Sequence, residues 1–114
     1  MATVFPTNRY ERDAKPLLTE QERAEVRDAI ASNPERHPVI PGTGGLRKAR
    51  WSRQGKGKSG GVRVIYYDWI SGDEVYLLHI YAKNEQADMS AADCEVVKAF
   101  VEELKRAKRE NKRH

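Results

Sequence analysis

Two stretches of sequence decide the fold: Val62–Ile70, which reads VRVIYYDWI, and Glu74–Ala82, which reads EVYLLHIYA. Both are rich in β-branched and aromatic residues, which favour strands. The turn signal at 71–73, Ser-Gly-Asp, separates them, so the sequence predicts a β-hairpin. Two long and mostly apolar strands indicate the centre of a sheet that other elements cover on at least one face.

The sequence on either side of this hairpin predicts two more strands and three helices. We expect strands at 3–5 and 46–51, helices at 8–15 and 19–33, and a final helix from Ser90 onward. The helix at 19–33 begins with a capping box, because Thr19 is followed three residues later by Glu22. The final helix carries an apolar stripe at helical spacing, formed by Val97, Phe100, Val101 and Leu104.

These elements predict an α+β fold in one domain, 1–114. Strands joined by short turns pair antiparallel, so we expect an antiparallel sheet with N-terminal helices and a C-terminal helix packed on it. The basic tail at 105–114 is predicted to extend the last helix and to fray. A chain of 114 residues buries one modest core, so its function is expected at a surface groove that meets a large partner.

Composition narrows the class of protein. The net charge of +4, with 33% charged residues, favours a polyanionic partner. A single cysteine, Cys94, leaves no disulfide within the chain and points to a reducing compartment. The sequence shows neither a signal peptide nor the roughly 20 apolar residues of a membrane span. We therefore expect a cytoplasmic protein without membrane contact.

The positive charge is concentrated in one segment. Residues 36–67 contain no Asp or Glu. The cations of the strand at 46–51, the loop after it and the start of the next strand are Arg47, Lys48, Arg50, Arg53, Lys56, Lys58 and Arg63. In a hairpin, Lys48, Arg50 and Arg63 can share one sheet face, with the loop lysines above it. Such a surface suits a phosphodiester backbone, and a neighbouring aromatic such as Tyr66 could stack on a base.

Other kinds of site have weaker support. The loop GKGKSGG at 55–61 is not a P-loop, because it does not match GxxxxGK[ST] and is followed by a strand. His37, His79 and His114 are far apart in sequence and form no zinc motif. His79 lies in the middle of a strand, where a buried structural histidine is commoner than a catalytic one. No metal or cofactor is expected.

Three runs together resemble the HigB branch of the RelE/ParE toxin superfamily: VIPGTGGLRKARW at 39–51, GKGKSGGVRVIYY at 55–67 and YLLHIYAKNEQADMS at 76–90. The resemblance covers about Val39 to Ser90. It implies a RelE-like fold and a toxin that cleaves mRNA in the ribosomal A site and so inhibits translation. It also implies a HigA-like antitoxin with a helix-turn-helix domain, so that operator DNA is contacted only through the antitoxin.

The resemblance implies roles for particular residues. Lys48, Arg50 and Arg63 match basic positions of RelE toxins, and Lys83 matches a basic position near the active site. Lys56 and Lys58 belong to the HigB-like loop. RelE has a further arginine and then a tyrosine in the last segment. Here Asn84 and Ser90 occupy approximately these places, so the acid and base of RelE cannot be copied.

RNA cleavage by 2′-OH attack supplies the candidate catalytic roles. Arg63 would stabilise the transition-state charge. Lys58 or Lys56 could act as base if neighbouring cations depress a lysine pKa. Lys83 could protonate the leaving oxygen, and Glu85 is a less favoured base. The RNA-binding candidates are Arg47, Lys48, Arg50, Arg53, Tyr66 and Asn84.

Two other functions fit parts of the sequence. A ParE-like protein shares the fold but poisons DNA gyrase without cutting RNA, and the focused basic segment argues against it. A non-catalytic module that binds RNA or the ribosome would have the same composition. Substitution of Arg63 separates an enzyme from a binder, because an enzyme loses cleavage while it retains much of its binding.

Overall fold

The computed structural model describes residues 1–53, 61–69 and 73–112. Its elements are, in chain order, β1 (Thr3–Pro6), α1 (Asn8–Ala14), α2 (Glu20–Ser32), β2 (Leu46–Trp51), β3 (Val62–Trp69), β4 (Glu74–Ala82) and α3 (Ala91–Lys112). Every predicted strand and helix is present, with ends that differ by one or two residues. None of the described helices combines the length and the apolar character needed to cross a bilayer.

The four strands form one mixed sheet in the order β1-β4-β3-β2. The pairs β2–β3 and β3–β4 are antiparallel, as the hairpin pattern predicts. The expectation of a wholly antiparallel sheet is wrong for β1, which pairs parallel to β4, with Thr3 opposite Glu74. The physical reason is that helices, rather than a tight turn, carry the chain away from β1, so a hairpin does not dictate its direction.

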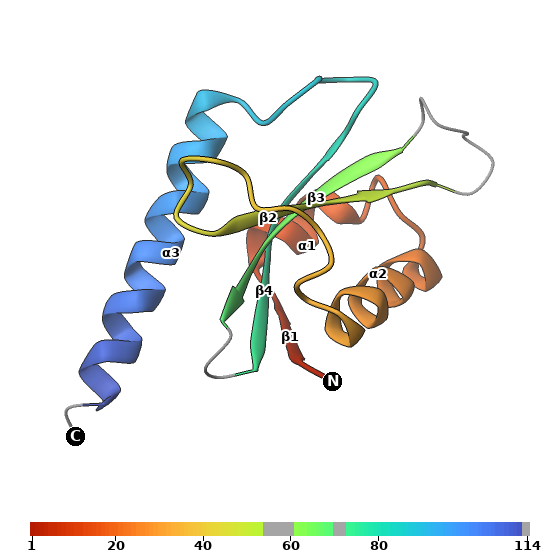
Figure 1. Ribbon diagram of the computed structural model, residues 1–114. Coiled ribbons are helices and arrows are strands. Elements are labelled where there is room, and N and C mark those ends of the chain that lie inside the picture. The colour runs from red at the N-terminus through yellow and green to blue at the C-terminus, as the bar shows by residue number, and fades with distance from the viewer. Residues whose placement is uncertain (54–60, 70–72, 113–114) are drawn as a thin grey trace.

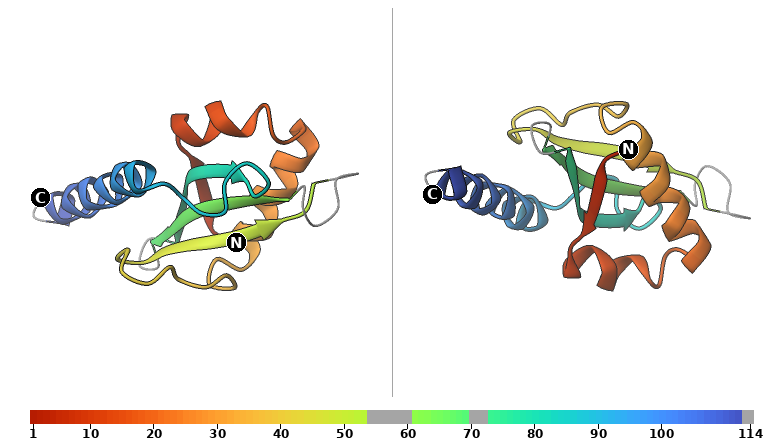
Figure 2. Two further views of the ribbon diagram at one scale, coloured as in Figure 1. Left: turned by 90° about the horizontal axis from the view of Figure 1, so that it is seen from above. Right: turned by 90° about the horizontal axis from the view of Figure 1, so that it is seen from below.

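Helices cover both faces of the sheet (Figures 1 and 2). On one face, α1 and α2 pack through Tyr10, Val26 and Ile30, each at most 2% exposed, against β3 and β4. On the other face, α3 packs through Val97 and Val101. The alternation of side chains along β3 supplies both cores, which explains why its sequence is apolar almost throughout.

Local hydrogen bonds set the starts of the N-terminal helices. The Thr7 side chain caps α1 by accepting from the backbone N–H of Tyr10. The predicted capping box of α2 is confirmed: Thr19 Oγ1 accepts from the N–H of Glu22, whose carboxylate accepts from the N–H of Thr19. These bonds satisfy backbone donors that a helix start would otherwise leave unpaired.

The apolar stripe of α3 divides between the core and the surface. Val97 and Val101 are 1% exposed, whereas Phe100 is 37% exposed and lies 6.2 Å, between ring centroids, from Tyr76. The next turns of α3 are held to β3 by cations, because Lys105 Nζ lies 5.7 Å from the centre of the Tyr67 ring. The stripe is therefore narrower than its spacing predicts, since only one edge of α3 meets the sheet.

Candidate nucleic-acid interface

The register between β2 and β3 places three cations on one face of the sheet. Arg50 is the Cα partner of Arg63, so both side chains leave the same face. Lys48 lies two residues before Arg50 on β2 and points the same way. Ile65, two residues after Arg63, belongs to the core beneath α3. The basic face, defined as Lys48, Arg50 and Arg63, is thus on the α3 side, and the grouping predicted from the sequence is confirmed.

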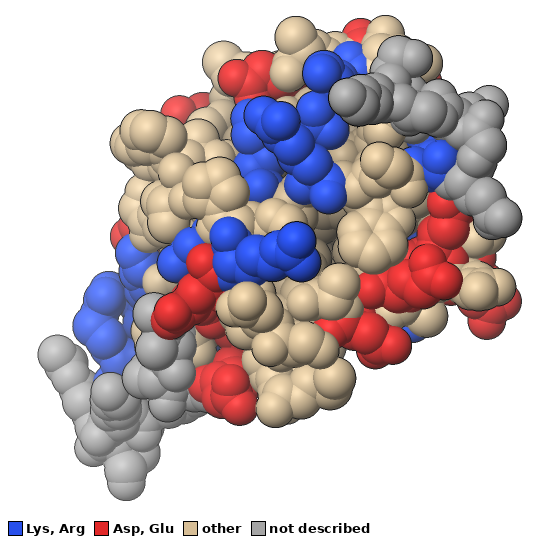
Figure 3. All heavy atoms as spheres, turned by 45° about the vertical axis from the view of Figure 1, so that its right-hand side comes forward, with Lys and Arg blue, Asp and Glu red and all other residues tan. Residues whose placement is uncertain are grey.

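On the face of the molecule shown in Figure 3, the charges are partly segregated. In the space-filling view, Lys and Arg side chains form a group in the upper half of the face shown (Figure 3). The largest group of Asp and Glu side chains lies apart from it, at the lower right (Figure 3). Separation of the two signs leaves a positive field over part of the surface, which attracts polyanions.

Arg63 is the least accessible cation of the basic face. It is 8% exposed, and its Nη1 donates to the carbonyl of Val62 at 3.2 Å. Among the described residues, no carboxylate lies within ion-pair distance of its guanidinium. Buried charges are normally paired, because desolvation is costly. Arg63 is therefore placed to receive an anion from outside the chain.

Tyr81 lies beside Arg63 and was not among the sequence candidates. It is the register partner of Arg63 on β4 and is 4% exposed. Its hydroxyl is buried and lies near the carboxylate of Asp88. Burial raises the pKa of Tyr81, nearby Asp88 raises it further and Arg63 opposes both. The phenol therefore stays protonated at neutral pH.

An acidic side chain reaches the basic face from another part of the chain. Asp88 Oδ1 lies 3.8 Å from Lys48 Nζ, and the Asp88 side chain is 78% exposed. Asp88 belongs to the connection between β4 and α3, which must extend over β3 to bring it to β2. The acid-free segment at 36–67 therefore does not produce an acid-free surface, and only the tertiary fold reveals this.

Three other candidates lie outside the basic face as defined here: Lys83, Asn84 and Arg53. Lys83 is exposed, and its backbone N–H donates to the carbonyl of Gly61 at 3.0 Å, beside the start of β3. Asn84 follows it and is also exposed. Arg53 lines a pocket with the residues that connect α1 to α2, away from the basic face. Lys56 and Lys58 lie outside the described residues.

Two RNA-binding candidates point away from the basic face. Arg47 Nη1 donates to the carbonyls of Glu35 and His37, at 3.1 and 2.6 Å. Tyr66 is fully buried in the core beneath α1 and α2, and its hydroxyl donates to the carbonyl of Pro34 at 2.6 Å. Each residue is an odd step along its strand from the basic face, so strand alternation turns it to the opposite side. Both side chains hold the segment after α2.

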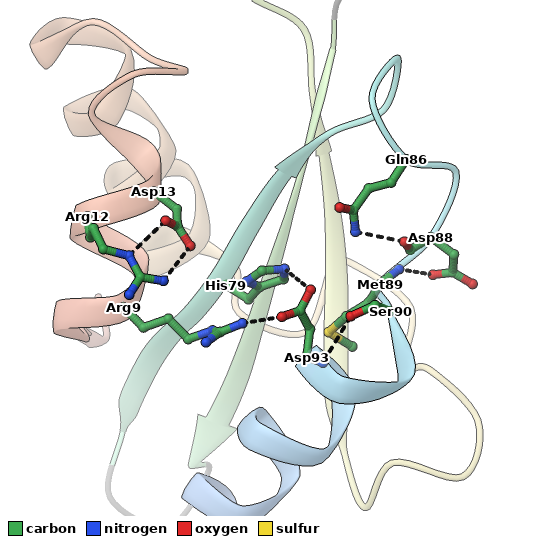
Figure 4. Close-up of polar contacts among 9 residues, drawn as sticks. All are labelled: Arg9, Arg12, Asp13, His79, Gln86, Asp88, Met89, Ser90 and Asp93. Carbon is green, nitrogen blue, oxygen red and sulfur yellow. Dashed lines mark hydrogen bonds and ion pairs between the residues drawn. The ribbon is translucent and has the colours of Figure 1, made fainter.

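A cluster of charged side chains surrounds His79 (Figure 4). His79 Nε2 lies 3.6 Å from Asp93 Oδ2, and Arg9 on α1 forms an ion pair with the same carboxylate. Burial lowers the pKa of His79, and Asp93 partly opposes this shift. The sequence contains no obvious acidic partner for His79, because Asp93 follows it by fourteen positions and lies on a different element.

Comparison with known proteins fits this geometry. The family model described as the RelE toxin of the RelE/RelB toxin–antitoxin system matches residues 3–113. The chain belongs to the RelE toxin family. The family prediction made from the three motif runs is confirmed, whereas the HigB-like branch stays a prediction. The basic face of this RelE-family chain thus lies on a family scaffold and is built from β2 and β3.

Solved structures support the same fold. E. coli RelE, as a double mutant in the free state, shares 15% identity, with 76% of this chain and 90% of that chain covered and a TM-score of 0.55. The isolated E. coli RelE toxin shares 18% identity, with 88% and 99% covered and a TM-score of 0.51. A chain of the intact E. coli RelBE toxin–antitoxin complex shares 14% identity, with 70% of this chain and 94% of that chain covered and a TM-score of 0.51.

Proposed function

We propose that this protein is the toxin of a type II toxin–antitoxin system and acts as a ribosome-dependent mRNA endonuclease. The observation that carries the proposal is Arg63, a nearly buried cation with no carboxylate partner in the described chain, beside Arg50 and Lys48. An uncompensated buried charge costs stability. A phosphate of the RNA backbone would neutralise this charge and would accept the fork of guanidinium donors.

The proposed reaction is attack of an RNA 2′-OH on the adjacent phosphorus. A bond forms between the 2′-oxygen and phosphorus, and the bond from phosphorus to the 5′-oxygen breaks. Arg63 would stabilise the extra negative charge of the transition state, and electrostatic stabilisation of this kind is usually the largest single contribution to catalysis. Lys48 and Arg50 would hold the flanking phosphates and so align the attack. The reaction as proposed needs no metal ion.

Proton transfer is assigned to lysines from two segments of the sequence, the loop that follows β2 and the connection that follows β4. Lys58 or Lys56 would remove the 2′-OH proton, provided that neighbouring cations favour the neutral amine. Lys83 would protonate the departing 5′-oxygen, and its place beside the start of β3 supports this role. Glu85 is the alternative base. Asn84 would contact the RNA from the same connection.

The proposed partners follow from this activity. The mRNA would be bound in the ribosomal A site, where the toxin inhibits translation in the cytoplasm. A cognate HigA-like antitoxin would neutralise the toxin and would provide any contact with operator DNA. Val96 and Phe100 on α3 are 49% and 37% exposed, and they leave apolar surface that a partner protein could cover.

Induced expression of the wild type and of Arg63→Ala, followed by primer extension on a translated mRNA, tests the function. We expect the wild type to arrest growth and to cut within codons, and the variant to do neither. Arg36→Ala is a matched control, because it removes the same charge from an exposed site outside the basic face. Growth arrest with intact mRNA would reject the proposal and favour a gyrase poison. Neither arrest nor cutting by the wild type would favour a non-catalytic binding module.

A further inference from the structure

A second polar pocket lies beside the basic face. Its volume is about 470 Å³, and its walls come from α1, the C-terminal end of β4, the start of the connection to α3, and the first turn of α3. Tyr81 lines this pocket and is also the register partner of Arg63. The pocket and the basic face are therefore neighbours, because Tyr81 lies between them, and a ligand long enough could occupy both.

Buried polar atoms without partners lie at the base of this pocket. His79 is 5% exposed, and neither of its ring nitrogens has a hydrogen-bond partner among the described residues. The hydroxyl of Tyr81 is buried as well and lies near the carboxylate of Asp88. The two rings are adjacent, with centroids 5.9 Å apart. Buried polar groups are almost always paired in folded proteins, so this group of atoms points to a polar ligand.

Two carboxylates of the pocket, those of Asp13 and Asp93, are held in place by arginines (Figure 4). Arg12 donates to both oxygens of Asp13, at 2.9 and 3.2 Å. Arg9 holds Asp93 from the same helix. An ionised carboxylate has about four lone-pair positions, so each of these groups can still accept from a ligand. Fixed acceptors of this kind suit recognition of N–H donors.

Charge distinguishes the pocket from the basic face. Two arginines line the pocket against three carboxylates, those of Asp13, Glu85 and Asp93. Burial favours the neutral form of His79. The pocket thus lacks the positive excess that a phosphate requires. A neutral group rich in N–H donors fits it better, next to a surface that takes anions. A nucleotide has these two chemically different ends.

We propose that this pocket binds a guanine base of the RNA strand whose phosphates lie on the basic face. Guanine presents two adjacent donors, N1–H and the N2 amino group, which match the two oxygens of a carboxylate. Unstacked bases in single-stranded RNA are commonly read along this edge. The proposal rests on the proposed function, because it takes RNA as the ligand. It assigns to the pocket a preference for one base near the cut.

Titration of the full-length protein with 5′-GMP tests the pocket directly. The imidazole signals of the three histidines are followed by NMR and are assigned with His79→Gln and His37→Gln. We expect a saturable shift of the His79 signals with GMP, and at least about tenfold weaker binding of AMP, CMP and UMP, since each lacks the paired donors. No shift with GMP, an equal shift with inorganic phosphate, or tighter binding of another nucleotide would overturn the proposal.

Two substitutions of equal charge change supply the matched comparison. Asp13→Asn, in the pocket, should weaken GMP binding by about tenfold or more, and Asp28→Asn, on the exposed surface of α2, should leave it unchanged. Equal effects of the two variants would contradict the assignment. Asp93→Asn provides a second pocket variant if Asp13→Asn fails to fold.

The experiments separate a failure of the guanine-binding proposal from a failure of the proposed nuclease function. Arg63→Ala should abolish RNA cleavage and keep the preference for GMP over AMP, CMP and UMP, because Arg63 does not line the pocket. Asp13→Asn should lower the share of cuts next to guanine relative to cuts next to the other bases, whereas Asp28→Asn should leave that share unchanged. Cleavage by the wild type without GMP binding would reject the pocket alone. GMP binding without cleavage would reject the nuclease function alone.

Discussion

Arg50 on β2 lies directly opposite Arg63 on β3 in the antiparallel pair, so two positive charges face each other across the two strands. Like charges directly opposite each other destabilise an antiparallel pair. Arg63 is also largely buried, which adds a desolvation cost. A bound anion would remove both penalties. The two facing arginines therefore lower the stability of the free protein and raise its affinity for phosphate.

Arg50→Ala should change stability and RNA binding in opposite directions. Loss of one of the two facing charges should raise the free energy of unfolding by about 0.2–1 kcal/mol. Affinity for a non-cleavable single-stranded RNA should fall, and the slope of log K against log salt should become shallower by about 0.7. Urea unfolding and fluorescence anisotropy measure the two effects. Equal loss of stability and binding would show that Arg50 has a structural role instead.

Asp88→Asn should strengthen RNA binding. The substitution removes an anion from the basic face and frees Lys48, 3.8 Å away, to contact a phosphate. Because the pair is mostly exposed, its worth is about 0.2–1 kcal/mol, which corresponds to an affinity gain of up to about fivefold. Anisotropy at two salt concentrations measures the gain. Asp28→Asn is the control for net charge, and an equal gain in that variant would refute a local effect of Asp88.

Tyr66→Phe should reduce stability and leave RNA binding unchanged. It removes the hydrogen bond from the phenol to the carbonyl of Pro34 and leaves the buried ring in place, which costs about 1 kcal/mol. Burial raises the pKa of Tyr66 to about 12, so the phenol remains a donor throughout the accessible pH range. The denaturation midpoint and the RNA dissociation constant are compared with those of the wild type. A weakened affinity for RNA would place Tyr66 at the interface after all.

Acid should destabilise the protein through His79. Burial lowers the pKa of His79 in the folded protein, while the unfolded chain titrates near about 6.5. The unfolded state therefore binds a proton first as the pH falls. Stability from neutral His79 is complete above about pH 6.5 and is lost below it, by up to about 1.4 kcal/mol per pH unit. The charged groups that act on His79 are Asp93, Arg9, Asp13 and Arg12.

Unfolding of the wild type and of His79→Gln at pH 7.5 and 5.5 measures this contribution. The variant should lose part of the pH dependence. His37 is also buried enough to lower its pKa, so it acts in the same direction. His37→Gln is therefore the second arm of the experiment. An identical pH dependence in wild type and His79→Gln would exclude the proposed role of His79.

Sequence patterns predict the elements of this protein well because each depends on neighbours in the chain. The capping box of α2 lies within four residues, and the hairpin of β3 and β4 depends on a short turn signal. The face shared by Lys48 and Arg50 needs only strand alternation, and the hairpin register adds Arg63. These inferences are local, so the chain order contains enough information to make them.

Tertiary structure decides the relations between distant segments. Residues 83–90 bring Asp88 to Lys48, and α3 brings Asp93 to His79 and Arg9. Likewise, β1 and β4 are the first and the last strand in the sequence, and the fold makes them neighbours in the sheet.

The sequence by itself thus determined the α+β elements and the basic face, because alternation and turn chemistry act over a few residues. Only the folded chain determined that Arg47 and Tyr66 form hydrogen bonds with the segment after α2. It also determined which acids approach the basic face and which polar groups line the second pocket. Each of these contacts depends on packing between elements that are distant in the sequence. Composition and residue spacing describe only short stretches of the chain, so they do not predict this packing.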